Sequence, residues 1–299
     1  MLWSSVLIIS SLSTVYSVCL KVFQKNHNSQ NKHFFIFSLC INLIQALVLL
    51  AMPPYSGWSF NRNNLLFGAL VGALILGNYF FTMLAYRTGP LALSNSIFGL
   101  SILVPIAFGL FFWDESLSVT AIIGLVLFLI SIMFVSNATY FEKETRKKTD
   151  FKWLLYVFLS LACNGATMIV SKQFARIAPD ESKPYLLVYI ACSMLLSILA
   201  IIIMSRGDHV DEAISVRQLF DKKYLLLCVV AGAVMAASNT VFMSAIGVSS
   251  SVFFFPATRG LTLIMVLILS YFLFRERLSK KAATGFILNA LAILMLSLG

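Results

Sequence analysis

Ten strongly apolar segments follow one another along the chain, separated by short polar stretches. Each is about 20 residues long, which is enough for a helix to cross the roughly 30 Å hydrocarbon core of a bilayer. Because lipid offers the backbone no hydrogen-bond partners, such segments are expected to be helical there. With 60% hydrophobic and only 11% charged residues, most of the chain cannot face water. The sequence therefore predicts an all-α integral membrane protein with ten transmembrane helices, at residues 2–22, 34–52, 65–86, 91–113, 117–136, 153–171, 184–204, 224–245, 252–274 and 282–298.

The first segment, MLWSSVLIISSLSTVYSVCL, has no charged region before it and no cleavage site of the A-x-A type. It is therefore predicted to be a retained helix and not a signal peptide. All five cysteines lie within predicted helices without C-x-x-C spacing, so neither disulfides nor a metal site is expected. The net charge of +10 is dispersed over the loops and forms no single basic face, which argues against a nucleic-acid partner.

Lys and Arg are distributed unevenly between the two sides of the predicted bundle. Most of them lie in the loops that follow the first, third, fifth, seventh and ninth segments. Because cytoplasmic loops are enriched in Lys and Arg, this asymmetry on its own predicts that both termini lie outside the cytoplasm. The predicted location is the cell membrane (plasma or inner membrane), which the chain crosses many times.

The two halves of the chain are related by an internal repeat. Shifting the sequence by 161 residues lays residues 78–136 on residues 239–297 without a gap. A weaker echo, offset by 151 residues, sets Lys21 against Lys172. The predicted domains are a first five-helix repeat at 1–137, a basic connecting loop at 138–152 and a second five-helix repeat at 153–299. The ungapped shift pairs Asn78 with Asn239, Gly99 with Gly260, Glu115 with Glu276, and Gly124 with Gly285.

Five is an odd number of helices, so the second repeat is predicted to enter the membrane in the orientation opposite to the first. The pseudo-twofold axis then lies in the membrane plane, and the two inverted repeats are expected to surround a central cavity. Two halves of similar structure can exchange inward-open and outward-open shapes around such a site. The repeat therefore favours a transporter that works by alternating access.

A short acidic hinge precedes the last, glycine-containing segment of each repeat, WDESLS at 113–118 and FRERLS at 274–279. With ten segments in two five-segment copies, nearly the whole chain resembles the EamA-type, ten-helix transporters of the drug/metabolite transporter superfamily. The resemblance implies a cavity lined by the first, third, fourth, sixth, eighth and ninth helices. It implies cargo such as amino acids, nucleotide precursors or drugs. It also implies cytoplasmic termini, which is the opposite of the prediction from charge.

Arg259 lies near the middle of an apolar stretch, SSSVFFFPATRGLTLIMVLILSYFLF. An Arg at mid-membrane costs about 2.5–3.5 kcal/mol on insertion scales. Its repeat counterpart is Phe98, so the scaffold itself requires no charge there, and every acidic residue lies outside or at the ends of the predicted helices. One interpretation is that Arg259 faces a hydrated cavity and binds a carboxylate or phosphate of the substrate. The other is that it extends to the nearer interface or is surrounded by backbone carbonyls.

Further substrate contacts are predicted among the polar and aromatic side chains of the cavity-lining helices. The predicted substrate-binding residues are Arg259, Asn78, Tyr79, Asn239, Asn95, Phe98 and Asn164. For the asparagines the alternative is hydrogen bonding between helices, which is the expected role of Asn42, Gln45 and Asn289. Lys21 and Lys172 close their helices, and both are expected to extend toward the interface.

The predicted helices contain no His, Asp or Glu. A membrane enzyme needs a general base, a metal cluster or an activated nucleophile, so an enzyme is not predicted and no catalytic, cofactor or metal site is assigned. The missing carboxylate also argues against proton antiport. The prediction is a facilitative carrier or exchanger of a small carboxylate-bearing metabolite, anionic or zwitterionic, such as an amino acid. The alternatives are a multidrug or toxic-metabolite exporter, and then a membrane sensor or scaffold that transports nothing.

Overall fold

The computed structural model describes residues 2–26, 31–52, 60–88, 94, 97–139, 151–207, 222–274 and 280–298. Within these ranges every regular element is a helix. The α-helices are α1 (Leu2–Asn26), α2 (Asn31–Ala51), α3 (Arg62–Thr88), α5 (Leu103–Phe112), α6 (Val119–Thr139), α7 (Phe151–Ile177), α8 (Ser182–Gly207), α10 (Lys222–Ile246), α11 (Ser251–Phe274) and α12 (Lys280–Ser297). Two short 3₁₀ turns, η1 (Leu100–Ile102) and η2 (Pro179–Glu181), precede α5 and α8.

Each of the ten predicted apolar segments falls on a helix, and the fourth differs most from its prediction. Its described part is α-helical at 97–99, passes through the 3₁₀ turn η1 and is α-helical again from Leu103. Pro105 lies in the first turn of α5 and has no backbone N–H, so the Ser101 carbonyl lacks its usual α-helical donor. A change of helix type at this point is therefore expected. The predicted connecting loop at 138–152 is also shorter than expected, because α6 extends to Thr139 and α7 begins at Phe151.

The helices have the length and the surface of a membrane protein. Five are long and apolar enough to cross a bilayer, and five further apolar helices of the described residues are shorter. Large apolar side chains are exposed on the outer faces, for example Phe158 at 65% and Leu195 at 63%. In water such a surface would be unfavourable, but in lipid it costs nothing. The predicted all-helical class is confirmed and the apolar helices are compatible with a membrane protein, while the crossing of all ten helices stays a prediction.

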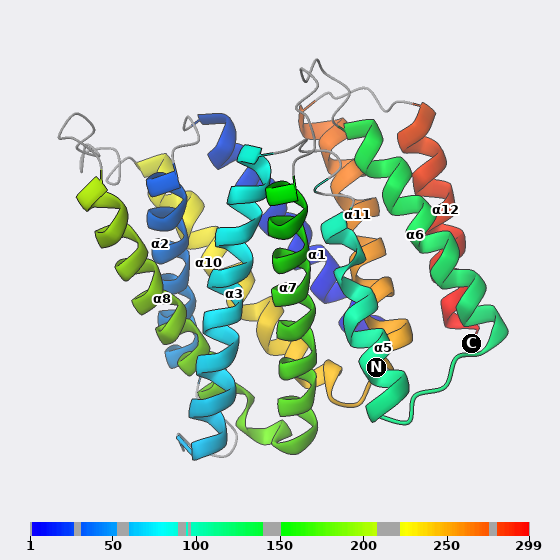
Figure 1. Cartoon of the computed structure of the whole chain (residues 1–299), viewed down its shortest axis with the longest axis horizontal. Coiled ribbons are helices and arrows are strands. Elements are labelled where there is room, and N and C mark those ends of the chain that lie inside the picture. The colour runs from blue at the N-terminus through cyan, green and yellow to red at the C-terminus, as the bar shows by residue number, and fades with distance from the viewer. Residues whose placement is uncertain are drawn as a thin grey trace.

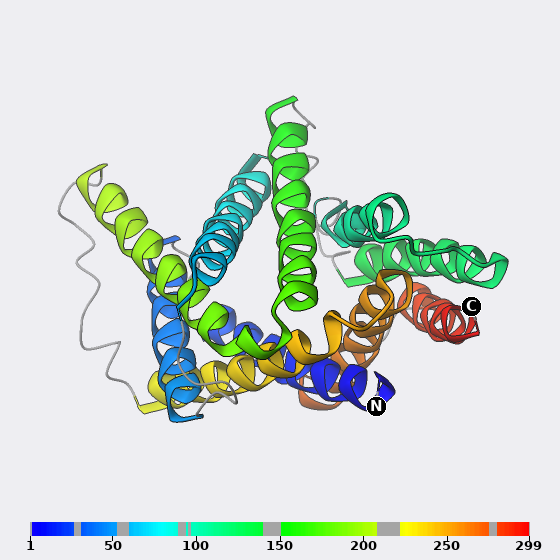
Figure 2. The ribbon, with the colours of Figure 1, turned by 90° about the horizontal axis from the view of Figure 1, so that it is seen from below.

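The helices stand in two rows, which Figures 1 and 2 show from two directions. One row contains α8, α3, α7 and α5 in that order, and the other contains α2, α10, α1 and α11. The rows meet at both edges, where α2 packs on α8 and α6 packs on α12. The start of α1 and the end of α12 lie at the same end of the bundle. In the predicted repeats α1 corresponds to α7, α2 to α8, α3 to α10 and α5 to α11. Replacing each helix of one row by its counterpart gives the order of the other row.

Individual contacts also occur in equivalent pairs. A methyl group added at Gly99 would lie 2.8 Å from Ile132 Cγ2, and one added at Gly260 would lie 3.1 Å from Ile293 Cδ1. The two glycines, and the two isoleucines, are separated by the same 161 residues as the sequence repeat. At the edge between α2 and α8, Asn42 Nδ2 donates a hydrogen bond of 3.3 Å to Ser193 Oγ, across 151 residues. That offset is the one that relates Lys21 to Lys172. These contacts agree with the predicted repeat.

Close approach of α5 to α7 depends on Gly165, and this gives a first testable prediction. A Cβ atom at this position would lie 2.5 Å from Val104 Cβ. We expect Gly165→Ala to lower the free energy of unfolding by about 1–3 kcal/mol, because α5 must move away from α7. SDS titration of the protein in mixed micelles measures this change.

Gly77→Ala is the matched control for that prediction. The nearest atom to its new methyl group, Cys163 Sγ, would be 3.4 Å away, which is an ordinary contact. The control should therefore unfold like the wild type or slightly later. Equal stability of the two variants would contradict the close contact between α5 and α7.

Candidate functional site

Two adjoining pockets lie between the rows of helices. The first lies between α1, α2, α3, α8 and α10 and contains about 430 Å³ of space, part of which is open to the outside. The second lies between α3, α7, α8 and α10 and contains about 390 Å³, also partly open. Ile75 and Tyr189 line both pockets, so the two form neighbouring parts of one region. The polar side chains of this lining are Tyr16, Ser38, Asn42, Gln45, Tyr79, Thr167, Ser171, Tyr185, Tyr189, Ser193 and Asn239.

Tyrosine hydroxyls connect the polar groups of this region. Tyr16 of α1 and Tyr79 of α3 share a hydrogen bond across the first pocket. Asn239 Nδ2 donates a bond of 3.3 Å to the Tyr189 hydroxyl, which lies between the two pockets. In the second pocket the Tyr185 hydroxyl is 3.0 Å from Ser171 Oγ. A ligand that enters the region therefore meets hydroxyl and amide groups, none of which is charged.

Gln45 of α2 is the residue of this lining that most strongly suggests a ligand. Its side chain is 1% exposed and contacts the Tyr189 hydroxyl. Its Nε2 atom has no hydrogen-bond partner among the described residues. A buried donor without a partner costs about 1–3 kcal/mol. An oxygen atom of a bound molecule in the first pocket would remove this cost.

The residues predicted to bind substrate are distributed over three environments. Tyr79 lines the first pocket and Asn239 lines the second. Asn78 Oδ1 accepts a bond of 2.7 Å from Ser160 Oγ, and Asn164 Nδ2 donates one of 2.7 Å to Ser101 Oγ. These two bonds join α3 to α7 and α7 to η1. They agree with the alternative role of the asparagines, which is hydrogen bonding between helices.

One other predicted residue, Phe98, is placed differently. Phe98 packs with Ala85, Trp153 and Val157 in a small apolar cluster, away from both pockets. Asn95 lies outside the described residues. Among the polar residues expected to join helices, Asn289 Nδ2 donates 3.0 Å to the Gly260 carbonyl. Asn42 bonds to Ser193 but also lines the first pocket, so the sequence alone could not separate packing from pocket lining.

Arg259 lies on α11, outside both pockets. Its side chain is exposed. Val252, seven residues earlier, lies on the same face of the helix and packs against Ile106 of α5. On the neighbouring face, Ser10 Oγ of α1 donates a bond of 3.1 Å to the Thr258 carbonyl. Arg259 therefore lies on the side of α11 that carries Val252, next to the face that contacts α1.

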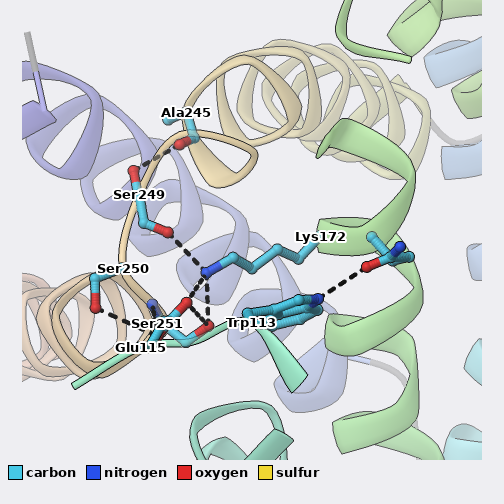
Figure 3. Close-up of polar contacts among 8 residues, drawn as sticks. Trp113, Glu115, Lys172, Ala245, Ser249, Ser250 and Ser251 are labelled. Carbon is cyan, nitrogen blue, oxygen red and sulfur yellow. Dashed lines mark hydrogen bonds and ion pairs between the residues drawn. The ribbon is translucent and has the colours of Figure 1, made fainter. Parts of the chain in front are cut away.

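A cluster of polar residues at one end of the bundle was not expected from the sequence (Figure 3). Lys172 of α7, predicted to extend to the interface, is instead buried, with its side chain 3% exposed. Its Nζ atom lies 2.5 Å from Glu115 Oε1. It also donates bonds of 2.7 Å to the Ser249 carbonyl and to Ser251 Oγ. The expectation for Lys172 was wrong because these partners come from segments that are distant in sequence.

Glu115 reaches this cluster through a tight turn after α5. The backbone N–H groups of Trp113 and Glu115 both donate to the Gly109 carbonyl, and Asp114 between them has a φ of 54°. A Cβ atom at Gly109 would lie 2.8 Å from Glu115 Oε2, so the carboxylate fits only beside a glycine. Glu115 Oε2 then accepts the backbone N–H of Ser251 at 2.8 Å. The carboxylate thus caps the N-terminus of α11 from another segment.

Trp113 of the same turn covers the ammonium group. Lys172 Nζ lies 4.7 Å from the centroid of the Trp113 ring, a cation–π distance. The ring is oriented by its Nε1 atom, which donates a bond of 2.8 Å to Gln173 Oε1 on α7. The acidic hinge WDESLS, singled out as a repeat motif, therefore supplies both the counter-ion and the aromatic cover of a buried lysine. No signal in the sequence linked Lys172 to Glu115, because the two residues are 57 positions apart.

The comparisons with known proteins concern the fold alone. No family model matches the chain, and no curated protein matches it. Among solved structures, the chain is similar to one described as "Crystal structure of protein", with a TM-score of 0.68 and 16% sequence identity. The similarity covers 99% of this chain and 98% of that chain. The same arrangement of helices therefore occurs in a second protein of nearly the same extent.

Proposed function

We propose that the protein is a carrier of the cell membrane that moves a small polar metabolite by alternating access, as transporters of the drug/metabolite type do. The observation that carries this proposal is the equivalence of the two halves. The contact of Gly99 with Ile132 recurs between Gly260 and Ile293, and the two rows have the same order of counterparts. Two repeats of opposite orientation can exchange their conformations, which opens a site between them to either side in turn.

The substrate site of this proposal is the region of the two pockets. Gln45 Nε2 and the tyrosine hydroxyls offer hydrogen bonds to oxygen or nitrogen atoms of a metabolite. Phe37 and Phe242 supply apolar surface beside them. Arg259 on α11 lies outside both pockets in this conformation, and we propose that it binds the acidic group of the metabolite when the rows rearrange, because a guanidinium pairs with a carboxylate by two parallel hydrogen bonds. The proposed cargo is therefore a carboxylate-bearing metabolite, moved by facilitated diffusion or exchange.

Counterflow tests the proposal. A thermal-shift screen against a metabolite library first identifies ligands that stabilise the purified protein. Proteoliposomes loaded with the best ligand are then diluted into a trace of the same ligand carrying a radiolabel. A carrier should accumulate the label transiently without an ion gradient, whereas protein-free liposomes should not. A ligand that binds but gives no counterflow would contradict transport and favour a membrane sensor.

Tyr189→Phe tests whether the pockets form the substrate site. Its hydroxyl lies between the pockets and accepts from Asn239, so its loss disturbs the polar groups of both. One hydrogen bond contributes about 1 kcal/mol, so we expect the affinity for the ligand to fall about fivefold. Titration calorimetry in detergent measures this change.

Tyr224→Phe is the matched control, because Tyr224 is buried on α10 and lines neither pocket. It should bind the ligand like the wild type. If Tyr189→Phe also binds with unchanged affinity, the substrate site is elsewhere in the bundle.

A further inference from the structure

The cluster around Lys172 and Glu115 connects the two rows of helices at one end of the bundle. Lys172 and Glu115 belong to α7 and to the turn after α5, which are in one row. Ser249 and Ser250 lie in the connection between α10 and α11, and Ser251 is the first residue of α11, so all three belong to the other row. The Lys172–Glu115 ion pair lies within one row, and five hydrogen bonds join it to these serines; we refer to these contacts as the Lys172–Glu115 cluster.

The cluster lies directly beside the proposed substrate region. Ser171 precedes Lys172 on α7 and lines the second pocket. The backbone of the connection also touches α7, because a Cβ atom at Gly247 would lie 2.7 Å from the Ala175 carbonyl oxygen. A molecule that leaves the second pocket toward this end would have to separate these segments. The cluster therefore closes the bundle at the end where α1 begins and α12 ends.

The chemistry of the cluster suits a contact that opens and closes. A buried ion pair gains little net stability over an apolar contact, because both charges must be removed from water. Once the segments separate, the ammonium and carboxylate groups can be rehydrated, which offsets the loss of the bonds. The connection lies at the surface of the molecule, since Ser250 is exposed and Val248 is 84% exposed.

We infer that the Lys172–Glu115 cluster is the gate of one entrance: the hydrogen bonds from the ion pair to Ser249 and Ser251 keep the rows together at this end, and their separation opens the pockets there. The inference depends on the proposed function, because only an alternating-access protein couples the opening of one end to the closing of the other. Ser249, Ser251 and the N-terminus of α11 would then move away from α7 as one unit with α11.

Hydrogen exchange measured by mass spectrometry tests the gate in the intact protein in nanodiscs. The variant is Glu115→Gln combined with Lys172→Met, which removes both charges and leaves neither one buried alone. We expect amide exchange in residues 249–254 to rise at least about tenfold. At the opposite end, exchange in the first turns of α7 and α10 should fall, because that end closes. The matched control, Glu181→Gln with Lys183→Met, neutralises two charges at the same end outside the cluster and should change neither.

The outcomes are distinguishable from those for transport itself. Faster exchange at 249–254 without slower exchange at the opposite end would mean that the cluster only fastens the fold, and would overturn the gate. Unchanged exchange at both ends would also overturn it. Counterflow by the wild type is measured separately, so a transporting protein without reciprocal exchange refutes the gate and leaves the proposed function standing.

Discussion

Lys172→Met should lower the free energy of unfolding by about 3–5 kcal/mol, the range for breaking one half of a buried ion pair. The Glu115 carboxylate, 12% exposed, would lose its cation, and the Ser249 carbonyl would lose a donor. The replacement has a similar length and still packs on Trp113, so the loss reports on charge and hydrogen bonds more than on volume. SDS titration in mixed micelles measures the change.

A double-mutant cycle shows whether the two charges act on each other. Glu115→Gln alone leaves the Lys172 ammonium buried without a carboxylate, so it should also destabilise, while its amide oxygen can still accept the Ser251 N–H. The double variant contains no unpaired charge and should be closer in stability to the wild type than either single variant. If Lys172→Met unfolds within about 1 kcal/mol of the wild type, Lys172 does not provide the counter-ion of Glu115.

Arg259→Gln should weaken the binding of carboxylate ligands by at least about 30-fold, which corresponds to 2 kcal/mol or more for a hydrogen-bonded charge pair. Gln can donate a single hydrogen bond and has no charge, so both the Coulomb attraction and the paired geometry are lost. The fold should not change, because the Arg259 side chain is exposed on α11. Calorimetric titration of the ligand found in the screen measures the affinity.

Two comparisons separate a substrate contact from an indirect effect. The methyl ester of the same ligand has no anion, so wild type and Arg259→Gln should bind it with similar affinity. Arg176→Gln removes another exposed arginine, which lies 5.7 Å from the Trp113 ring, and should leave carboxylate binding unchanged. Equal affinities of wild type and Arg259→Gln for the acid would assign Arg259 to contacts with the interface or with backbone carbonyls.

Hydropathy located the helices because a helix needs an apolar run of about 20 residues to cross the hydrocarbon core. It could not show which face of a helix meets which neighbour, since almost every face is apolar. Tyr16, Gln45 and Tyr189 were therefore not assigned to a site, and the second and seventh segments were not expected to line one. The structure assigns both α2 and α8 to the pocket lining.

The repeat was the more informative signal, because it relates positions that are distant in sequence. Its pairing of Gly99 with Gly260 corresponds to two equivalent helix contacts. By contrast, the expected interfacial position of Lys172 was derived from its place near a helix end. Whether a lysine there is buried depends on a carboxylate from another segment. The separation in sequence between Lys172 and Glu115 follows neither the helix period nor the repeat. Tertiary pairs of this kind are not visible in one sequence.

The unequal lengths of the helices have a consequence for the surrounding lipid. The 27 residues of α7 rise about 40 Å, whereas the 18 residues of α12 rise about 27 Å. The edge formed by α6 and α12 is therefore thinner than the part of the molecule around α3 and α7. If α6 and α12 cross the bilayer as predicted, acyl chains next to that edge must shorten or tilt to match it, at a modest cost for each ångström of mismatch.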